Sequence, residues 1–366
     1  MLSAPHESLR SLRRDPWCAA LLTGLVLTLF TASCSGGDQR AEQATARKSS
    51  TETEARAAST EQSVTTQPAG PRTPKSKRRA LVWIALEDAN QVALVDVARA
   101  KVLARRAAPG GPHNVTVASD GTAAATLYGS DRIVLVRPGG RTRFMELGGG
   151  PHDVKAVGKL FVVANESGRR LDFIRNGRHV ASLRLDAEPH DLAIAPGGNR
   201  AWVTLNGTDE LAIVDLRARQ VVRSIATGFR PHDLLFAPDG RVWVTDWQGP
   251  VHVFDRRGRL QGAVELGQES HHLAFTPDGR QAWVTDHAAG RVFVVDARSL
   301  EVIAALPVSG GPHHVAITPD GVLAAVADHE SGTVVAYDVR RRSRVRVIEV
   351  GAGPHGVWAL PAQRSP

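Results

Sequence analysis

The sequence predicts an all-β protein, a seven-bladed β-propeller closed by pairing of its C-terminal strand with its N-terminal blade. The first observation behind this prediction is a Pro-His motif, once replaced by Ser-His, that returns about every forty residues. The second is that each interval holds short β-branched and aromatic runs separated by Gly, Pro and Asp turns. This period, with four short strands in each repeat, is typical of a propeller blade. The seven copies are Pro112-His113, Pro151-His152, Pro189-His190, Pro231-His232, Ser270-His271, Pro312-His313 and Pro354-His355.

One repeat shows the order of the strands inside a blade. Residues 231–237 form the first predicted strand, and residues 238–240, a Pro-Asp-Gly turn, lead into the second strand at 241–246. A third strand is expected at 251–255 and a fourth at 260–266, with turn residues between them. The four strands follow one another as antiparallel neighbours, so one repeat is one complete sheet.

The two ends of the repeat region determine how the ring closes. Residues 81–85 match the second strand of a repeat and have no Pro-His strand before them. Residues 354–360 match a first strand and have no second strand after them. The C-terminal strand is therefore expected to complete the N-terminal blade, which leaves no open sheet edge.

The N-terminal region has the pattern of an export signal. Arginines precede an apolar run, residues 19–30, that is too short to span a bilayer. Small residues then lead to a lone cysteine, Cys34, and this pattern resembles the lipobox of bacterial lipoproteins. The alternative is an ordinary signal peptide cut just before Cys34. We predict a lipoprotein-type signal peptide over residues 1–34, lipidation of Cys34, and a protein anchored to the bacterial membrane, at the cell surface or in the periplasm.

Residues 35–79 are rich in Ser, Thr, Ala, Glu and Gln, and we expect a disordered linker there, followed by the propeller over 80–366. Both cysteines, Cys18 and Cys34, precede the propeller, which therefore has no thiol and no disulfide. The net charge of +8 favours anionic surfaces, but the arginines are not interleaved with aromatic residues. We expect no nucleic-acid partner and a monomeric protein.

The repeat also places most histidines on one face of the ring, which we call the upper face. First strands begin on this face, and the loops between second and third strands lie on it as well. Their imidazoles and carboxylates are expected to converge on a funnel that binds the ligand. The predicted binding residues are His113, His152, His190, His232, His271, His272, His313, His314, His355, Asp286, His287, Asp328, His329 and Glu330.

Two interpretations of the motif histidines remain open. Imidazoles and carboxylates that converge in a funnel can coordinate a divalent metal ion such as zinc, copper or magnesium, and His271, His313 and His232 are the predicted ligands. Alternatively, the motif histidine is a structural residue, copied by duplication, that bonds the neighbouring blade. All seven histidines are not expected to bind one ion, because zinc in proteins takes about four ligands.

The opposite, lower face carries the turns between first and second strands and between third and fourth strands. Arginines recur in the outer turns, for example at Arg217, Arg219, Arg257 and in the run 340–342. They are either solvated hairpin tips or a surface that lies against the anionic membrane to which Cys34 is attached.

Segments 239–246, 278–286 and 331–338 resemble YVTN-type (YncE-like) propeller repeats, with Trp-Val-Thr replacing Tyr-Val-Thr in several blades. The resemblance covers roughly residues 80–360 and implies the fold, while the activity stays open because such propellers include binding proteins and some enzymes. The chain is also similar to virginiamycin B lyase and its relatives, which hold a metal near histidine and glutamate. This second resemblance implies His232, His271, His313 and Glu330 as the equivalent residues.

The sequence therefore favours a non-enzymatic binding propeller that holds a small-molecule ligand or a protein partner in its upper funnel. The alternative is a divalent-metal-dependent enzyme, a lyase, hydrolase or oxidoreductase, with its site in the same funnel. No Gly-x-Ser-x-Gly elbow, phosphate-binding Gly-rich loop or paired zinc motif occurs in the sequence. The sequence identifies no catalytic residue.

Overall fold

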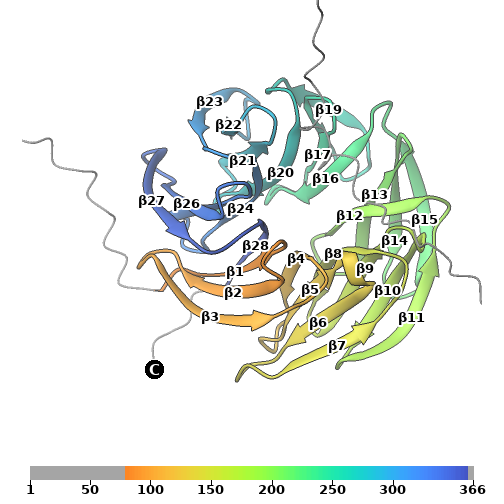
Figure 1. Cartoon of the computed structure of the whole chain (residues 1–366). Coiled ribbons are helices and arrows are strands. Elements are labelled where there is room, and N and C mark those ends of the chain that lie inside the picture. The colour runs from red at the N-terminus through yellow and green to blue at the C-terminus, as the bar shows by residue number, and fades with distance from the viewer. Residues whose placement is uncertain (1–78, 362–366) are drawn as a thin grey trace, which may run out of the picture. The chain divides into compact units, whose positions relative to one another are not determined.

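Seven four-stranded antiparallel sheets are arranged as a ring in the computed structural model, which describes residues 79–361 (Figure 1). The predicted seven-bladed propeller is confirmed. The predicted signal peptide, Cys34 and all of the predicted linker before Arg79 lie outside the described residues. Within residues 79–361, no helix is long and apolar enough to cross a membrane.

The blades follow one another along the chain. The first comprises β28 (Pro354–Ala359), β1 (Leu81–Leu86), β2 (Gln91–Asp96) and β3 (Lys101–Ala107). The second and third comprise β4 (Pro112–Val117), β5 (Ala123–Leu127), β6 (Arg132–Val136), β7 (Thr142–Glu146), β8 (Pro151–Val157), β9 (Leu160–Asn165), β10 (Arg170–Arg175) and β11 (Arg178–Arg184). The fourth and fifth comprise β12 (Glu188–Ile194), β13 (Arg200–Asn206), β14 (Glu210–Asp215), β15 (Gln220–Ala226), β16 (Pro231–Phe236), β17 (Val242–Asp246), β18 (Val251–Phe254) and β19 (Leu260–Val264). The last two comprise β20 (Ser270–Phe275), β21 (Gln281–Asp286), β22 (Arg291–Asp296), β23 (Val302–Pro307), β24 (Pro312–Ile317), β25 (Leu323–Asp328), β26 (Thr333–Asp338) and β27 (Ser343–Glu349).

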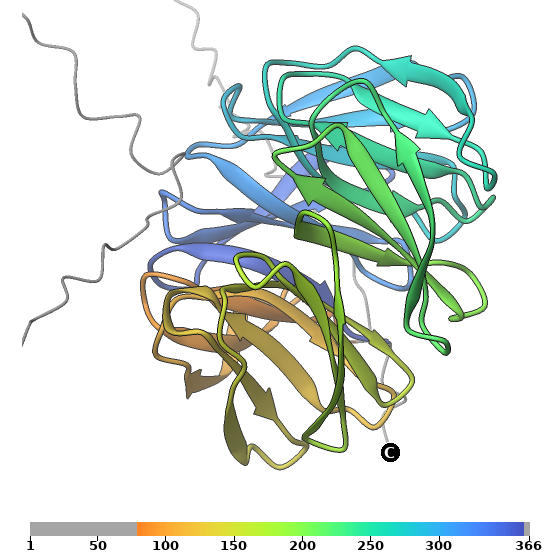
Figure 2. The ribbon, with the colours of Figure 1, turned by 90° about the vertical axis from the view of Figure 1, so that its right-hand side faces the viewer.

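The first strand of each blade lies at the centre of the ring, and the fourth strand lies at its rim (Figure 1). Figure 2 shows the ring from the side, with the strands of each blade twisted as they run between the two faces. The ring closes as the sequence predicted, because β28 pairs antiparallel with β1, with Trp83 opposite Trp358. β28 also contacts β24 and β4, the first strands of the blades on either side.

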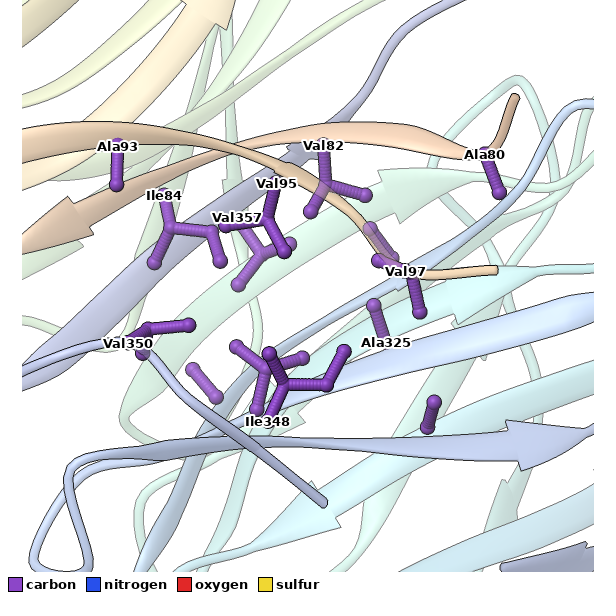
Figure 3. Packing of buried hydrophobic residues seen from close by; sticks show 14 of the residues in the cluster. Ala80, Val82, Ile84, Ala93, Val95, Val97, Ala325, Ile348, Val350 and Val357 are labelled. Atoms are coloured by element: carbon purple, nitrogen blue, oxygen red, sulfur yellow. The ribbon is translucent and has the colours of Figure 1, made fainter. Parts of the chain in front are cut away.

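Apolar side chains fill the spaces between neighbouring blades. At the closing blade, Val82, Ile84 and Val95 point toward Ala325 and Ile348 of the preceding blade (Figure 3). All five are buried. Burial of each larger side chain contributes about 1.5–3 kcal/mol, so this packing holds the blades together without any covalent cross-link.

The Pro-His motif coincides with a β-bulge in the first strand. In β16, Pro231 pairs with Asp246 and Leu234 pairs with Val244, so two residues, His232 and Asp233, lie opposite Thr245 alone. The same register shift occurs at the motif of every blade. A bulge bends the strand and re-aims its side chains, and here it brings both the histidine and the next residue to the centre of the ring.

Candidate metal centre

Seven imidazoles form a closed ring around the centre of the propeller. They belong to the seven motif histidines, His113, His152, His190, His232, His271, His313 and His355. Each imidazole lies beside the next, and the centroids of neighbouring rings are 3.8–4.9 Å apart, including the pair His113–His355 that closes the circle. The bulge places them at equivalent positions, so the sequence repeat becomes a ring in space.

The imidazoles are more deeply buried than an open funnel would leave them. His232 is 1% exposed and His271 is 7% exposed. Burial lowers the pKa of His232 to about 3. It also lowers the pKa of five other ring members well below the ordinary value, with repulsion from neighbouring imidazoles acting in the same direction: His113, His190, His271, His313 and His355. These six imidazoles are neutral at neutral pH, and neutral imidazole is the form that binds metals.

Some ring histidines bond the neighbouring blade, which supports the structural interpretation for those residues. The Nδ1 of His152 lies 3.1 Å from the carbonyl oxygen of His190, and the Nδ1 of His232 lies 3.0 Å from that of His271. A carbonyl oxygen only accepts, so Nδ1 donates in both pairs, and the neutral imidazole of His232 keeps its lone pair on Nε2. The Nδ1 atoms of four others have no hydrogen-bond partner in residues 79–361: His113, His271, His313 and His355.

A second layer of side chains lies next to the ring, at the residue that follows each motif histidine. Its members are Asn114, Asp153, Asp191, Asp233, His272, His314 and Gly356. The sequence analysis identified His272 and His314 but missed the three aspartates. The signal was present in the repeat, because the position after the histidine is polar in every blade except that of Gly356.

One partly buried lysine, Lys155, interacts electrostatically with all three aspartates. Lys155 Nζ lies 2.6 Å from both carboxylate oxygens of Asp153. Burial alone would lower the pKa of Lys155, but attraction to Asp153, Asp191 and Asp233 outweighs it and raises that pKa. Burial raises the pKa of Asp233 to about 7, and burial with repulsion from Asp153 and Asp233 raises that of Asp191. The Asp233 carboxyl group can therefore hold a proton near neutral pH.

Within residues 79–361, four groups of histidines and carboxylates have the spacing of metal ligands. In each group the ligand atoms lie within 4.8 Å of one another. Zinc with tetrahedral bonds of about 2.0–2.1 Å needs its ligand atoms about 3.3 Å apart, so small side-chain rotations complete such a site. The groups are His232–His271–His272, His152–His190–Asp191, Asp191–Asp233–His272 and Glu87–His113–His355.

This arrangement of repeats corresponds to a known family. The family model for YNCE-like β-propellers matches residues 159–364. The chain belongs to this family. The YncE-like resemblance of the repeats is thereby confirmed.

Several proteins similar to this YNCE-like propeller have been named or solved. NirF of Stutzerimonas stutzeri is 27% identical over 133 residues, which are 31% of this chain and 34% of NirF. The chain thus matches about a third of the length of NirF. A putative 6-phosphogluconolactonase of Bacteroides uniformis superposes with a TM-score of 0.66 at 17% identity, over 77% of this chain and all of that one.

Solved structures of two enzymes, NirN and virginiamycin B lyase, share the fold as well. The dihydro-heme d1 dehydrogenase NirN, in complex with DHE, superposes with a TM-score of 0.58 at 18% identity, covering 81% of this chain and 78% of NirN. Virginiamycin B lyase of Staphylococcus aureus superposes with a TM-score of 0.59 at 14% identity, covering 70% of this chain and 94% of the lyase. At these identities the likeness shows the fold alone.

Aromatic and polar side chains surround the ring on one side. Tyr128, in the short 3-10 helix η1 (Tyr128–Ser130), has its ring centroid 5.8 Å from that of His113. Its hydroxyl donates to Glu166 at 2.7 Å, and Asn206 donates to the other carboxylate oxygen of Glu166 at 2.8 Å. Trp247 packs on His232 with centroids 4.0 Å apart. The sequence analysis missed Tyr128, Asn206 and Trp247, because their loops carry no repeated motif.

The predicted loop residues lie in different surroundings. His287 and His329 lie beside the ring of seven motif histidines, and the centroid of each imidazole is less than 5 Å from that of His313. Glu330 is exposed. Asp286 instead accepts backbone N–H bonds from residues 268, 269 and 289 of its own blade, and Asp328 accepts from the hydroxyl of Ser309. These two carboxylates close loops, and neither belongs to one of the four metal-ligand groups.

Proposed function

We propose that this protein is a binding propeller whose centre holds a transition-metal ion, with His232, His271 and His272 as the principal ligands. Three imidazoles favour zinc or copper over magnesium, which prefers oxygen ligands. The fold supports a binding role but does not choose among ligands. The choice of a metal rests on the chemistry of these three side chains.

One observation carries the proposal. The Nδ1 of His232 donates to the carbonyl oxygen of His271 at 3.0 Å, and the Nδ1 of His272 lies 3.1 Å from a carboxylate oxygen of Asp233. Histidines that bind metals generally donate their other ring N–H to a carbonyl or carboxylate, which orients the ring and fixes the tautomer. When the Asp233 carboxyl group is ionised it accepts from Nδ1 of His272, and both histidines then keep Nε2 lone pairs for a metal.

The surrounding groups extend this site around the ring. Asp191 belongs both to the group with His152 and His190 and to the group with Asp233, and His272 links the latter to the principal group. One carboxylate oxygen of Asp191 is buried and has no hydrogen-bond partner among the described residues. An ion held by His272 would offer that oxygen a ligand position.

Metal titration of the full chain, purified without a His-tag, tests the proposal. His272→Asn is the informative variant, because asparagine occupies the equivalent position in another blade at Asn114. We expect uptake of zinc or copper, measured by calorimetry and elemental analysis, and at least a tenfold loss of affinity in His272→Asn. His179→Asn, on the outer strand β11, is the control. A folded protein that takes up neither metal, or equal binding by His272→Asn, would overturn the proposal.

We also propose that the protein is exported and anchored to the membrane through lipidated Cys34. The basis is the sequence pattern of residues 1–34. Mass spectrometry of the protein from its membrane fraction should find a diacyl or triacyl modification on Cys34, and Cys34→Ser should release it into the soluble fraction. An unmodified N-terminus at another residue would contradict the anchor.

A metal-dependent enzyme with its site in the same place is the alternative. The observation that favours it is the chain of Tyr128, Glu166 and Asn206 beside the imidazoles, which provides aromatic and polar contacts for an organic substrate. p-Nitrophenyl acetate is a general probe for metal-activated water. Saturable hydrolysis that requires the metal would favour the enzyme, and metal uptake without hydrolysis of this ester would favour the binding propeller.

A further inference from the structure

A second group of possible metal ligands lies where the ring closes. Glu87 directly follows β1, His113 is the second residue of β4, and His355 is the second residue of β28, the last strand of the propeller. β28 pairs with β1 on one side and contacts β4 on the other. The group therefore joins the first hairpin of the propeller, the second blade and the C-terminal strand, and it shares no residue with His232, His271 and His272.

The two histidines of this group are buried and incompletely bonded. His113 is 6% exposed and His355 is 3% exposed, and their ring centroids are 3.8 Å apart. The Nδ1 atom of each has no hydrogen-bond partner within the described part of the chain. A buried polar atom without a partner destabilises the folded state, and a bound metal ion would remove that cost.

Glu87 adds the anionic ligand and connects the group to solvent. Its backbone N–H donates to the carbonyl oxygen of Gly353 at 2.7 Å, which fixes the glutamate beside the start of β28. Its side chain is 29% exposed. Ligand atoms of Glu87, His113 and His355 lie within 4.8 Å of one another, and Nε2 of His329 lies 3.8 Å from a Glu87 carboxylate oxygen.

We propose that Glu87, His113 and His355 form a second metal site, which takes a divalent ion such as Zn²⁺ and fastens the C-terminal strand to the first hairpin. Two histidines and one glutamate are an established donor set for zinc and leave a fourth position for water or another ligand atom. An ion that binds only the closed ring stabilises that state by mass action. The inference deepens the proposed metal-binding function but rests on different side chains.

Zinc titration of the metal-free full chain separates the two sites. The variants are Glu87→Gln for the second site, His272→Asn for the first, and Asp88→Asn as the control, because it removes the same charge one residue further on. We expect the wild type and Asp88→Asn to bind zinc at both sites. Glu87→Gln should lose one equivalent, and with it part of the zinc-dependent rise in Tm, while His272→Asn should lose only the other equivalent.

Hydrogen exchange of β28 gives a second readout that does not depend on stoichiometry. Zinc should slow exchange at residues 354–359 in the wild type and in His272→Asn, and it should have little effect there in Glu87→Gln. Zinc binding and β28 protection that are unchanged in Glu87→Gln would overturn the second site and leave the first intact. If Glu87→Gln loses zinc and His272→Asn does not, the second site is supported and the proposed site at His232, His271 and His272 is overturned.

Discussion

The hydroxyl of Thr245 donates a hydrogen bond to the backbone carbonyl oxygen of His271, 2.9 Å away, across the boundary between two blades. The same hydroxyl oxygen accepts the backbone N–H of Asp233 at 2.9 Å. Thr245 therefore fills the bulge in its own blade and ties it to the next histidine of the ring. Thr126 bonds Asn114 and His152 in the same way, and Thr285 bonds His272 and His313, so in these three blades the threonine holds neighbouring histidines in register.

Replacing this threonine by valine should destabilise the ring while preserving side-chain volume. Thr245→Val leaves the N–H of Asp233 buried without a partner and removes one of two hydrogen bonds to the carbonyl of His271, which should lower the free energy of unfolding by about 1–3 kcal/mol. Urea unfolding measures the change. Thr142→Val, on the exposed edge strand β7, is the matched control and should be nearly neutral. Equal unfolding midpoints for the two variants would contradict the assignment of Thr245.

The buried imidazoles should make the metal-free protein sensitive to acid. Burial lowers the pKa of His232 to about 3, so the fold keeps it neutral while the unfolded chain takes up a proton near pH 6.5. Each such histidine lowers the free energy of unfolding by about 1.4 kcal/mol per pH unit below about pH 6.5. Asp233 acts in the opposite direction, because its pKa is raised to about 7 and the folded state holds the extra proton.

Six ring histidines have lowered pKa values, so they should outweigh the acidic groups. With a chelator present, the urea midpoint should fall steeply between about pH 7.5 and pH 5.5. In Asp233→Asn the fall should be steeper, because the opposing group is gone. A midpoint that stays constant or rises toward pH 5.5 would show that the imidazoles are not held neutral.

The blades could be predicted from the sequence, but much of the site could not. The motif at His232 marks the start of a first strand, and its period alone fixes the number and order of the blades. The bulge opposite Thr245 is a backbone register shift that no residue type announces, so the inward aim of Asp233 was missed. Likewise, Asp286 resembles a funnel ligand because it lies in an upper loop. Its carboxylate instead accepts backbone N–H bonds from residues 268 and 289, and these contacts depend on the folded positions of the loops, which the sequence pattern does not show.

The arginine-rich lower face should bind anionic membranes. In its outer turns the acidic side chains accept backbone N–H bonds, as Asp255 does from Arg257, while the arginines are exposed. The full chain with Cys34→Ser, which cannot be lipidated, should therefore sediment with vesicles of anionic lipid at low salt and not with neutral vesicles. High salt should release it, because it screens exposed charges.

Charge reversal tests which face makes this contact. Arg340→Glu with Arg342→Glu on the lower face should weaken vesicle binding at least tenfold, since each basic residue near the surface contributes about 1 kcal/mol. Arg184→Glu with Arg291→Glu makes the same change in net charge at the upper ends of β11 and β22 and should have a much smaller effect. Equal losses in the two double variants would indicate a general charge effect without a preferred face.

Gly356 occupies the second-layer position of the closing blade, where the other blades carry asparagine, aspartate or histidine. A Cβ atom there would lie 2.6 Å from the carbonyl oxygen of His113 and 2.8 Å from the Cα of Asn114, so backbone would have to move at the seam of the ring. We expect Gly356→Ala to lower the free energy of unfolding by about 1–3 kcal/mol. In Gly262→Ala, the added methyl meets only a methyl group of Leu300, at 3.0 Å, and should cost less. Urea midpoints that rank the two variants in the reverse order would show that the seam can relax.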